Sequence, residues 1–238
     1  MSAFYQGLQD KELNFSLAGD GTCTNRTGVA SFPCSGAGTV EGRADGGAAM
    51  LKAVYQPYEA LQYYAAFGAG DYTLSVASLA WTNVLTGDRP GQIYQAGVKA
   101  VLWPDTVAGP GLAADLSFGW QRYWFTELQP AHAASEASIN QRLDILQTQF
   151  ALQTGHRFTG PEKEPWRVGV EPYGGLKWVR DQAWLKDFEG GGRAGGIKDT
   201  FTPFLGVHLK VYEKEALYAE ASFVNGWEYA AGLSVRFK

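Results

Sequence analysis

Apolar and polar side chains alternate in three consecutive runs at the carboxyl end of the chain. The apolar positions are Leu205, Val207, Leu209 and Val211, then Leu217, Ala219, Ala221 and Phe223, then Tyr229, Ala231, Leu233, Val235 and Phe237. Because successive side chains of a strand point to opposite faces, this pattern predicts antiparallel strands with one apolar and one polar face. The Asn225-Gly226 pair between the second and third runs is a strong signal for a tight hairpin.

The same alternation recurs along the chain and predicts ten strands. They span residues 11–19, 46–56, 59–71, 92–103, 111–124, 142–157, 166–180, 201–213, 215–224 and 228–237. The connections at 57–58, 104–110, 158–165 and 214 are short, whereas those at 20–45, 72–91, 125–141 and 181–200 are long. Short turns at one end and long loops at the other are typical of outer-membrane barrels. The sequence therefore predicts an all-β fold, a single antiparallel up-and-down transmembrane β-barrel formed by residues 1–238.

The two faces of these strands differ in a way that indicates which one meets lipid. The apolar face of the first three predicted strands carries Leu13, Phe15, Leu17, Leu51, Ala53, Tyr55, Leu61, Tyr63, Ala65 and Phe67. The opposite face of the barrel carries Glu12, Asn14, Lys52, Gln62, Lys99, Asp115, Gln147, Gln149, Arg167, Glu171 and Lys177. Aromatic residues gather near strand ends, as in the girdles at lipid interfaces. We expect the apolar face outside; the alternative is a soluble ligand-binding barrel with that face inside.

Composition excludes several classes of protein. No stretch approaches the eighteen or so apolar residues of a membrane-spanning helix. The net charge of -4 and the scattered Lys and Arg residues argue against nucleic-acid binding. Cys23 and Cys34 lie eleven residues apart in a segment rich in Gly, Ser and Thr, which predicts a disulfide formed in an oxidising compartment. No secretory signal is recognisable, and the cysteine pair favours one that has been removed.

Two segments resemble a known class of barrel. The run from Tyr229 to Phe237 resembles the closing strand of small Gram-negative outer-membrane barrels, although Lys238 follows the terminal aromatic residue. The segment from Tyr64 to Tyr72 is similar to the glycine-punctuated strands of OmpA-, OmpX- and OmpW-like barrels. This resemblance implies a location in the bacterial outer membrane, with the lipid bilayer and lipopolysaccharide as partners. The long loops would then offer a surface for a protein partner.

A charged cluster on the predicted inner face is the strongest candidate for a site. Its members are Glu171, His208, Lys210, Glu220 and Arg236. Because their charges are mixed, we expect salt bridges that fill a narrow lumen; a selectivity ring or a proton relay is the alternative. Ten strands leave little room, since eight strands are just filled by side chains. We therefore expect a narrow pore or a structural barrel, and the alternative is a barrel that anchors a partner through its long outer loops.

An enzymatic role finds little support in the motifs. His208 is followed by Lys210 where lipid A deacylases carry a serine, and the Trp178-Val-Arg-Asp181 segment lacks the histidine that an omptin-like protease requires. His132, His156 and His208 are not spaced beside the cysteines as zinc ligands would be. We therefore expect no enzyme activity, no cofactor and no metal ion, with a lipid-modifying or proteolytic outer-membrane enzyme as a further alternative.

Overall fold

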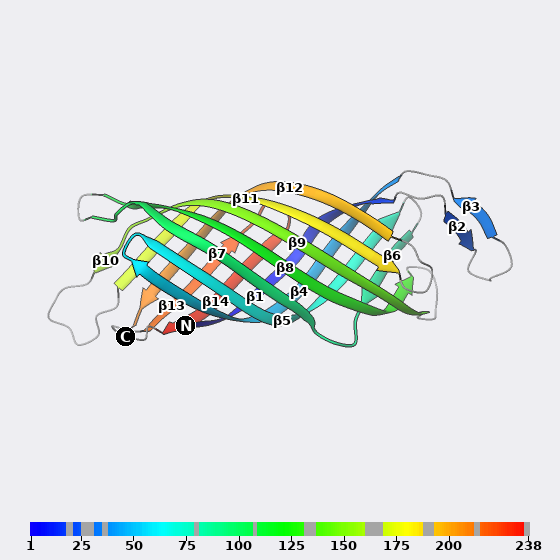
Figure 1. Cartoon of the computed structure of the whole chain (residues 1–238), viewed down its shortest axis with the longest axis horizontal. Helices are drawn as coiled ribbons and strands as arrows, with labels where there is room; N and C mark the ends of the chain where they lie inside the picture. The colour runs from blue at the N-terminus through cyan, green and yellow to red at the C-terminus, as the bar shows by residue number, and fades with distance from the viewer. Residues whose placement is uncertain are drawn as a thin grey trace.

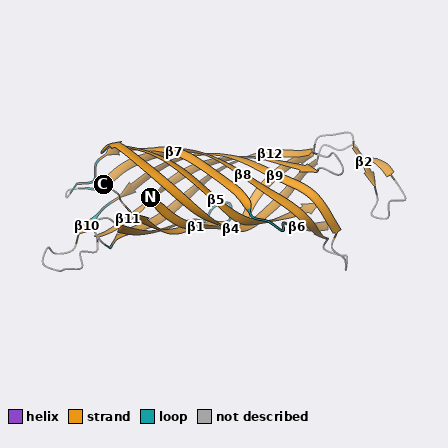
Figure 2. Ribbon diagram, turned by 60° about the horizontal axis from the view of Figure 1, so that its bottom comes forward, coloured by secondary structure: helices purple, strands orange, loops and turns teal. Residues whose placement is uncertain are grey.

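A closed β-barrel forms the body of the molecule (Figures 1 and 2). The computed structural model describes residues 1–17, 21–24, 31–34, 38–78, 81–106, 109–130, 137–159, 169–187, 193–211 and 215–235. The strands of the wall are β1 (Ser2–Leu17), β4 (Gly38–Tyr58), β5 (Leu61–Ser78), β6 (Trp81–Thr86), β7 (Gly91–Trp103), β8 (Gly111–Pro130), β9 (Ala137–Gly155), β11 (Gly169–Asp187), β12 (Arg193–Lys210), β13 (Glu215–Ser222) and β14 (Trp227–Val235). A short β10 (Phe158–Thr159) pairs with β11, and β2 (Gly21–Thr24) pairs only with β3 (Ser31–Cys34).

Neighbouring strands of the wall are all antiparallel, and β1 pairs with β14 to close it. β6 and β7 lie end to end between β5 and β8, so the two segments together form one of the ten strands of the barrel. The predicted fold class and strand number are therefore confirmed. Met1 and Val235, the two ends of the described chain, lie together at one end of the barrel, which we call the terminus end, and the β2–β3 hairpin lies beyond the opposite, loop end (Figure 1).

The wall loses two strands toward the loop end. β13 and β14 form a short hairpin, and beyond its tip β1 pairs directly with β12, through Ser16 with Gly195 and Leu17 with Ala194. Within the described residues, the ring at the loop end consists of β1, β4, β5, β6, β8, β9, β11 and β12. An eight-stranded barrel has an interior just wide enough for side chains to fill. The lumen therefore narrows from the terminus end to the loop end.

Most strands extend further toward the loop end than the sequence pattern predicts. The predicted loop 72–91 holds the end of β5 and all of β6, and the predicted loops 125–141 and 181–200 also consist largely of strand. The reason is a change in the outward face. Arg43, Asp45 and Asp71 occupy outward positions there, while inward Leu74 and Leu85 are buried. In this region the outward side chains are polar, which is not the pattern of a lipid-facing strand. The sequence pattern therefore ended these strands too early.

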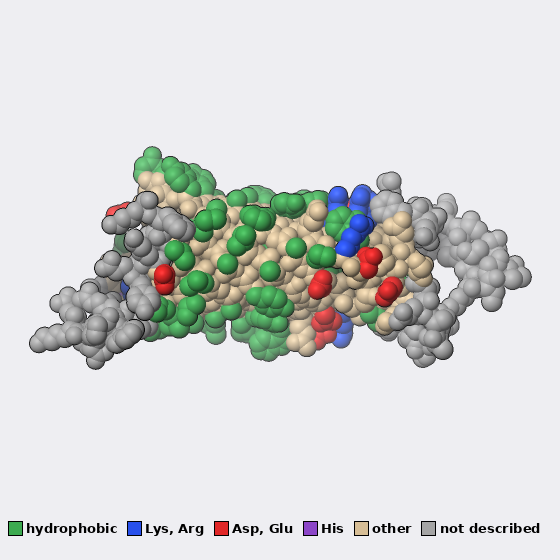
Figure 3. Space-filling model, turned by 90° about the horizontal axis from the view of Figure 1, so that it is seen from below, with side chains coloured by type: hydrophobic (Ala, Val, Ile, Leu, Met, Phe, Trp, Pro, Cys, Tyr) green, Lys and Arg blue, Asp and Glu red, His purple; other side chains and the backbone are tan. Residues whose placement is uncertain are grey.

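The outward face near the terminus end is an apolar belt. Tyr55 and Phe201 expose 70% and 73% of their surface, and many other large apolar side chains are similarly exposed. Hydrophobic side chains cover this part of the wall, whereas acidic and basic side chains gather toward the loop end (Figure 3). Such a belt cannot face water in a soluble barrel, since contiguous apolar surfaces of this extent associate or enter lipid. The belt therefore favours the membrane barrel over the soluble alternative.

One stretch of β1 has the opposite orientation to the prediction. Leu13 and Phe15, expected to face lipid, are 1% and 2% exposed and lie in the interior, and Glu12, expected inside, is exposed. The register between β1 and β4 shifts between Leu8 and Lys11. A bulge inserts an extra residue, so every later side chain changes faces. The side chains of Asn14 and Leu17 lie outside the described set.

The hairpin tip between β13 and β14 is joined to this bulge. The Asn225 side chain accepts a hydrogen bond from the Glu12 amide at 3.2 Å and donates one to the Glu12 carbonyl at 3.3 Å. Asn225 and Gly226 have positive φ angles of 67° and 87°, as the tight turn requires, which confirms the predicted hairpin. A Cβ at position 226 would lie 2.4 Å from the Gln9 carbonyl oxygen, so the close approach also requires glycine.

The two cysteines lie on the separate β2–β3 hairpin. Its register pairs Cys23 with Phe32 and Cys34 with Gly21, so the two cysteines are not directly opposite each other. The predicted disulfide is not supported by this arrangement.

In the part of the chain that the structure describes, no helix is long and apolar enough to cross a membrane.

Candidate functional site

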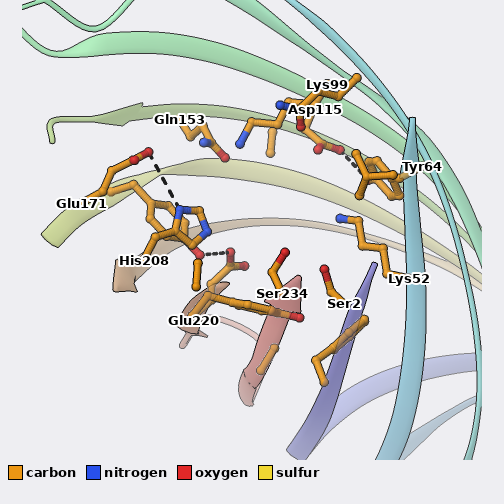
Figure 4. A pocket seen from close by; sticks show the side chains of 18 of the residues that line it. Ser2, Lys52, Tyr64, Lys99, Asp115, Gln153, Glu171, His208, Glu220 and Ser234 are labelled. Atoms are coloured by element: carbon orange, nitrogen blue, oxygen red, sulfur yellow. Dashed lines mark hydrogen bonds and ion pairs between the residues drawn. The ribbon is translucent and has the colours of Figure 1, made fainter. Parts of the chain in front are cut away.

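A polar cavity of about 450 Å³ occupies the terminus half of the lumen. Inward side chains of β1, β4, β5, β7, β8, β9, β11, β12, β13 and β14 line it (Figure 4). A second cavity of about 290 Å³ shares Gln62, Lys99 and Arg157 with the first and extends to Glu59 and Asp105 in the turns at the terminus end. Together the two cavities connect the middle of the barrel with its terminus end.

Four of the five residues of the predicted cluster line this cavity. Glu171, His208, Lys210 and Glu220 all do so, whereas Arg236 lies outside the described residues. Glu171 accepts hydrogen bonds from Arg157 at 3.1 and 3.2 Å, and its other oxygen lies 3.9 Å from His208 Nδ1. The functional role of the cluster stays a prediction. The contacts of Glu171 with Arg157 and His208 show opposite charges lying next to each other.

Glu220 contacts residues of β11 and not Lys210, its neighbour in the predicted cluster. Lys210 is opposite Ala216 and Glu220 is opposite Gly206, so Lys210 and Glu220 are separated along the β12–β13 ladder. Glu220 accepts a hydrogen bond from the Tyr173 hydroxyl at 3.0 Å and lies 3.9 Å from Lys177 Nζ. These partners come from β11, which the sequence pattern could not place beside β13 because the barrel curvature brings them together.

A buried ion network separates the cavity from the loop half of the barrel. Lys11 lies 3.0 Å from Asp181 and 3.2 Å from Glu228, while Lys177 lies 3.3 Å from Glu228. The Lys11, Lys177 and Asp181 side chains are each at most 7% exposed. Gln147 donates a further hydrogen bond to Asp181 at 2.9 Å. Sequence reasoning missed this network because Lys11 follows the bulge and Asp181 was assigned to a loop.

The loop half of the lumen is filled by apolar side chains, which we call the plug. Its most deeply buried members, each at most 3% exposed, are Leu13, Phe15, Leu74, Leu85, Phe125, Leu143 and Ile145. Tyr72 and Tyr123 stack against each other between the plug and the ion network, with ring centroids 4.2 Å apart. These side chains come from β1, β5, β6, β8 and β9, and Ala44 of β4 and Ala183 of β11 belong to the same cluster. The plug therefore occupies the narrow part of the barrel.

Two lysines enter the cavity from the wall opposite the predicted cluster. Lys52 of β4 places its Nζ 3.7 Å from the centroid of the Tyr64 ring, and Lys99 projects from β7 beside Asp115 (Figure 4). The Tyr64 hydroxyl donates a hydrogen bond to Asp115 at 2.8 Å. Within the described ranges, neither lysine forms an ion pair or a hydrogen bond.

The rim of the cavity is held together by Asp105, in the turn after β7. Its carboxylate accepts a hydrogen bond from the Arg157 amide at 2.9 Å and contacts His156 Nδ1 at 2.8 Å. These hydrogen bonds, the first from Arg157 and the second from His156, lower the pKa of Asp105 below its ordinary value. Asp105 therefore stays ionised in mild acid, and it links the β7–β8 turn to the segment after β9.

A cationic patch lies on the outer surface where the apolar belt ends. Asp144 contacts Arg122 at 2.6 Å, Arg142 at 3.0 Å and Lys186 at 3.9 Å, so three cations surround one carboxylate. Trp124 is opposite Arg142 in the register, and Arg122 lies 4.5 Å from the Trp120 ring. Interleaved tryptophans and cations are typical of the interface between hydrocarbon and headgroups.

Metal binding has no evident place among the described side chains. No group of three or more His, Cys, Asp or Glu residues within the described ranges is placed to hold an ion.

Comparisons with known proteins give similar structures without sequence relatives. No family model matches the chain, and no curated protein matches it. The translocator domain of the autotransporter NalP from Neisseria meningitidis is 12% identical, with 100% of this chain and 89% of that chain covered and a TM-score of 0.48. The outer membrane protease OmpT from Escherichia coli is 11% identical, with coverages of 99% and 96% and a TM-score of 0.46. An outer membrane channel from Pseudomonas putida F1 is 11% identical, with coverages of 99% and 94% and a TM-score of 0.32.

These likenesses concern the barrel fold alone. The similarity to OmpA-, OmpX- and OmpW-like barrels is not confirmed. The expectation that the chain is not an enzyme does not stand, because an outer-membrane protease is among the similar structures; at 11% identity this is no evidence of proteolysis here. The architecture itself follows from the strand pairing and the apolar belt: the chain folds as a closed antiparallel β-barrel with an apolar outer surface.

Proposed function

We propose that the chain is a structural barrel of the bacterial outer membrane whose lumen is closed to ions and solutes. The observation that carries this proposal is the plug in the loop half of the lumen. Phe15, Phe125 and Leu143 are at most 2% exposed, and they lie where the wall has eight strands. Protein interiors pack as densely as organic crystals. A solute crossing this barrel would have to displace closely packed side chains.

The ion network adds a second obstacle at mid-barrel. Lys11, Lys177, Asp181 and Glu228 bind one another, so their charges do not present a row of one sign along the axis. Conducting pores use rings of charge or a water-filled lumen wide enough for hydrated ions. A mutually neutralised cluster instead stabilises the interior of a closed barrel.

The outer face supports an orientation in the membrane. We place the terminus end and its short turns in the periplasm and the loop end outside, as in barrels of this kind. The patch of Arg122, Arg142 and Lys186 then lies at the outer edge of the apolar belt. Cationic side chains at this depth pair with phosphate groups, so lipopolysaccharide and other anionic lipids are the proposed partners of this patch.

Electrical recording tests the closed lumen directly. The full chain is inserted into planar bilayers, and its insertion is verified by flotation of the same protein with lipid vesicles. We expect no single-channel current. A Phe15→Ala, Phe125→Ala double variant removes two rings from the plug and is expected to conduct. Discrete current steps from the unmodified chain would overturn the proposal and support the narrow pore instead.

A further inference from the structure

The cavity at the terminus end has an excess of positive charge. Its lining holds five lysine or arginine side chains and three carboxylates, apart from His208. Two of the carboxylates have cationic neighbours, since Arg157 binds Glu171 and Lys177 lies near Glu220. Lys52 and Lys99 make no ion pair within the described residues. The excess charge is therefore located on the wall formed by β4 and β7.

Asp115 is the carboxylate that acts most strongly on these two lysines, and Glu220 also lies within electrostatic range of both. Asp115 is the carboxylate that faces them in the cavity, and it already accepts a hydrogen bond from Tyr64 (Figure 4). Lys52 lies within electrostatic range of both Lys99 and Asp115. Ammonium groups that are partly removed from water are costly unless an anion pairs with them. Glu171 and Glu220 have Arg157 and Lys177 as their cationic neighbours, so the space beside Lys52 and Lys99 favours an anion that is not part of the protein.

The opposite wall of the cavity is aromatic. The Tyr173 ring stacks on His208 with centroids 4.6 Å apart, and His208 meets Tyr218 edge-on at 6.1 Å. Phe4 continues this wall, with its ring centroid 6.0 Å from that of Tyr218. An aromatic surface facing a cationic one suits a ligand with a planar apolar part and an anionic group.

We propose that this cavity binds a small organic anion, with its carboxylate between Lys52 and Lys99 and its apolar part against Phe4 and Tyr218. The cavity of about 450 Å³ is in the range of small-molecule sites. The ligand enters from the terminus end, where the smaller cavity also includes Lys99. This inference rests on the proposed closed barrel, because the plug makes the cavity a blind pocket instead of a passage.

Calorimetric titration of the full chain in detergent micelles tests the proposal, with benzoate as the probe and empty micelles as the blank. Benzamide has the same shape without the charge, and we expect it to bind at least about tenfold more weakly than benzoate. A Lys52→Met, Lys99→Met double variant is expected to lose at least about tenfold in benzoate affinity. An Arg43→Met variant, on the outward face of β4 and outside the cavity, is the matched control and should bind benzoate as the unmodified chain does.

The outcomes separate this inference from the proposed function. Equal affinity for benzoate and benzamide, no benzoate binding at millimolar concentration, or unchanged affinity in the double variant would each overturn the anion site. The first two comparisons use the unmodified chain, so they hold even if the double variant does not fold. Channel activity with intact benzoate binding would refute only the closed barrel, whereas an electrically silent protein without benzoate binding would refute only the site.

Discussion

At the scale of single residues, the interior of the barrel depends on charges that compensate one another. Lys11 has two acidic partners, Asp181 and Glu228, and Glu228 is shared with Lys177. Taking charges out of water costs several kcal/mol per ion, and the attraction between partners offsets this only when the geometry is good. Replacing all of these charged side chains by apolar ones should therefore destabilise the barrel less than removing one charge from the network.

Replacing Lys11 by methionine should destabilise the barrel strongly. The substitution keeps most of the side-chain volume but leaves Asp181 and Glu228 with one cation fewer, and losing one partner of a buried pair costs about 3–5 kcal/mol. Urea unfolding in lipid vesicles, followed by tryptophan fluorescence, measures the change. Lys186→Met is the control, because Lys186 lies 3.9 Å from Asp144 at the surface and should contribute about 1 kcal/mol or less. Equal losses in the two variants would contradict the structural role of the network.

At the scale of elements, the short β13–β14 hairpin determines where the lumen narrows. Its tip ends against the bulge in β1, and the Asn225 side chain takes the place of backbone pairing with Glu12. Beyond the tip, β12 reaches β1 directly. The short connection at residues 223–226 therefore fixes the level at which ten strands become eight.

Substitutions at Asn225 should show how much this junction contributes. Asn225→Gly keeps the positive φ angle but removes both hydrogen bonds to Glu12, and we expect a loss of about 1–3 kcal/mol of unfolding free energy. Asn225→Ala also strains the turn, so it should lose more. The same unfolding assay compares the two variants with the unmodified chain. A glycine variant as stable as the unmodified chain would show that the hydrogen bonds do not stabilise the junction.

The sequence pattern located each of the ten strands but not their lengths. It succeeded in the belt, where outward residues such as Leu205 are apolar and inward ones such as His208 are polar. It failed at the loop end, where the outward side chains are polar and the inward ones apolar. It also failed at Leu13 and Phe15, because the alternation of apolar and polar residues in the sequence does not reveal a bulge. Four members of the predicted cluster line the cavity, yet Lys11 and Asp181 were missed for the same two reasons.

At the scale of the whole molecule, the barrel has two halves of opposite polarity. The terminus half is apolar outside and polar inside, and the loop half is polar outside and apolar inside. The terminus half matches a hydrocarbon environment, and the loop half matches water. The barrel therefore extends beyond the membrane as a water-exposed collar with its own apolar core.

Two outward arginine substitutions should distinguish these halves. Leu205→Arg places a charge in the belt, where 64% of the leucine surface is exposed, and should cost about 2–4 kcal/mol if the site is near the bilayer midplane. Thr73→Arg, on the outward face of β5 and opposite Asp45, should change stability by less than about 1 kcal/mol. Vesicle unfolding measures both variants. Similar costs at the two positions would show that the collar is also surrounded by lipid.

The sequence alone determined that this chain forms ten two-faced strands, because side-chain direction in a strand follows directly from position parity. The exposed apolar belt of the structure then showed that the apolar face of most strands lies outside. Only the tertiary structure decided where that parity changes, which charges meet and which side chains fill the loop half of the lumen. These properties depend on register, on one bulge and on the length of one hairpin. They bring together residues that are far apart in the chain, such as Lys11 and Asp181, and no local period encodes such contacts.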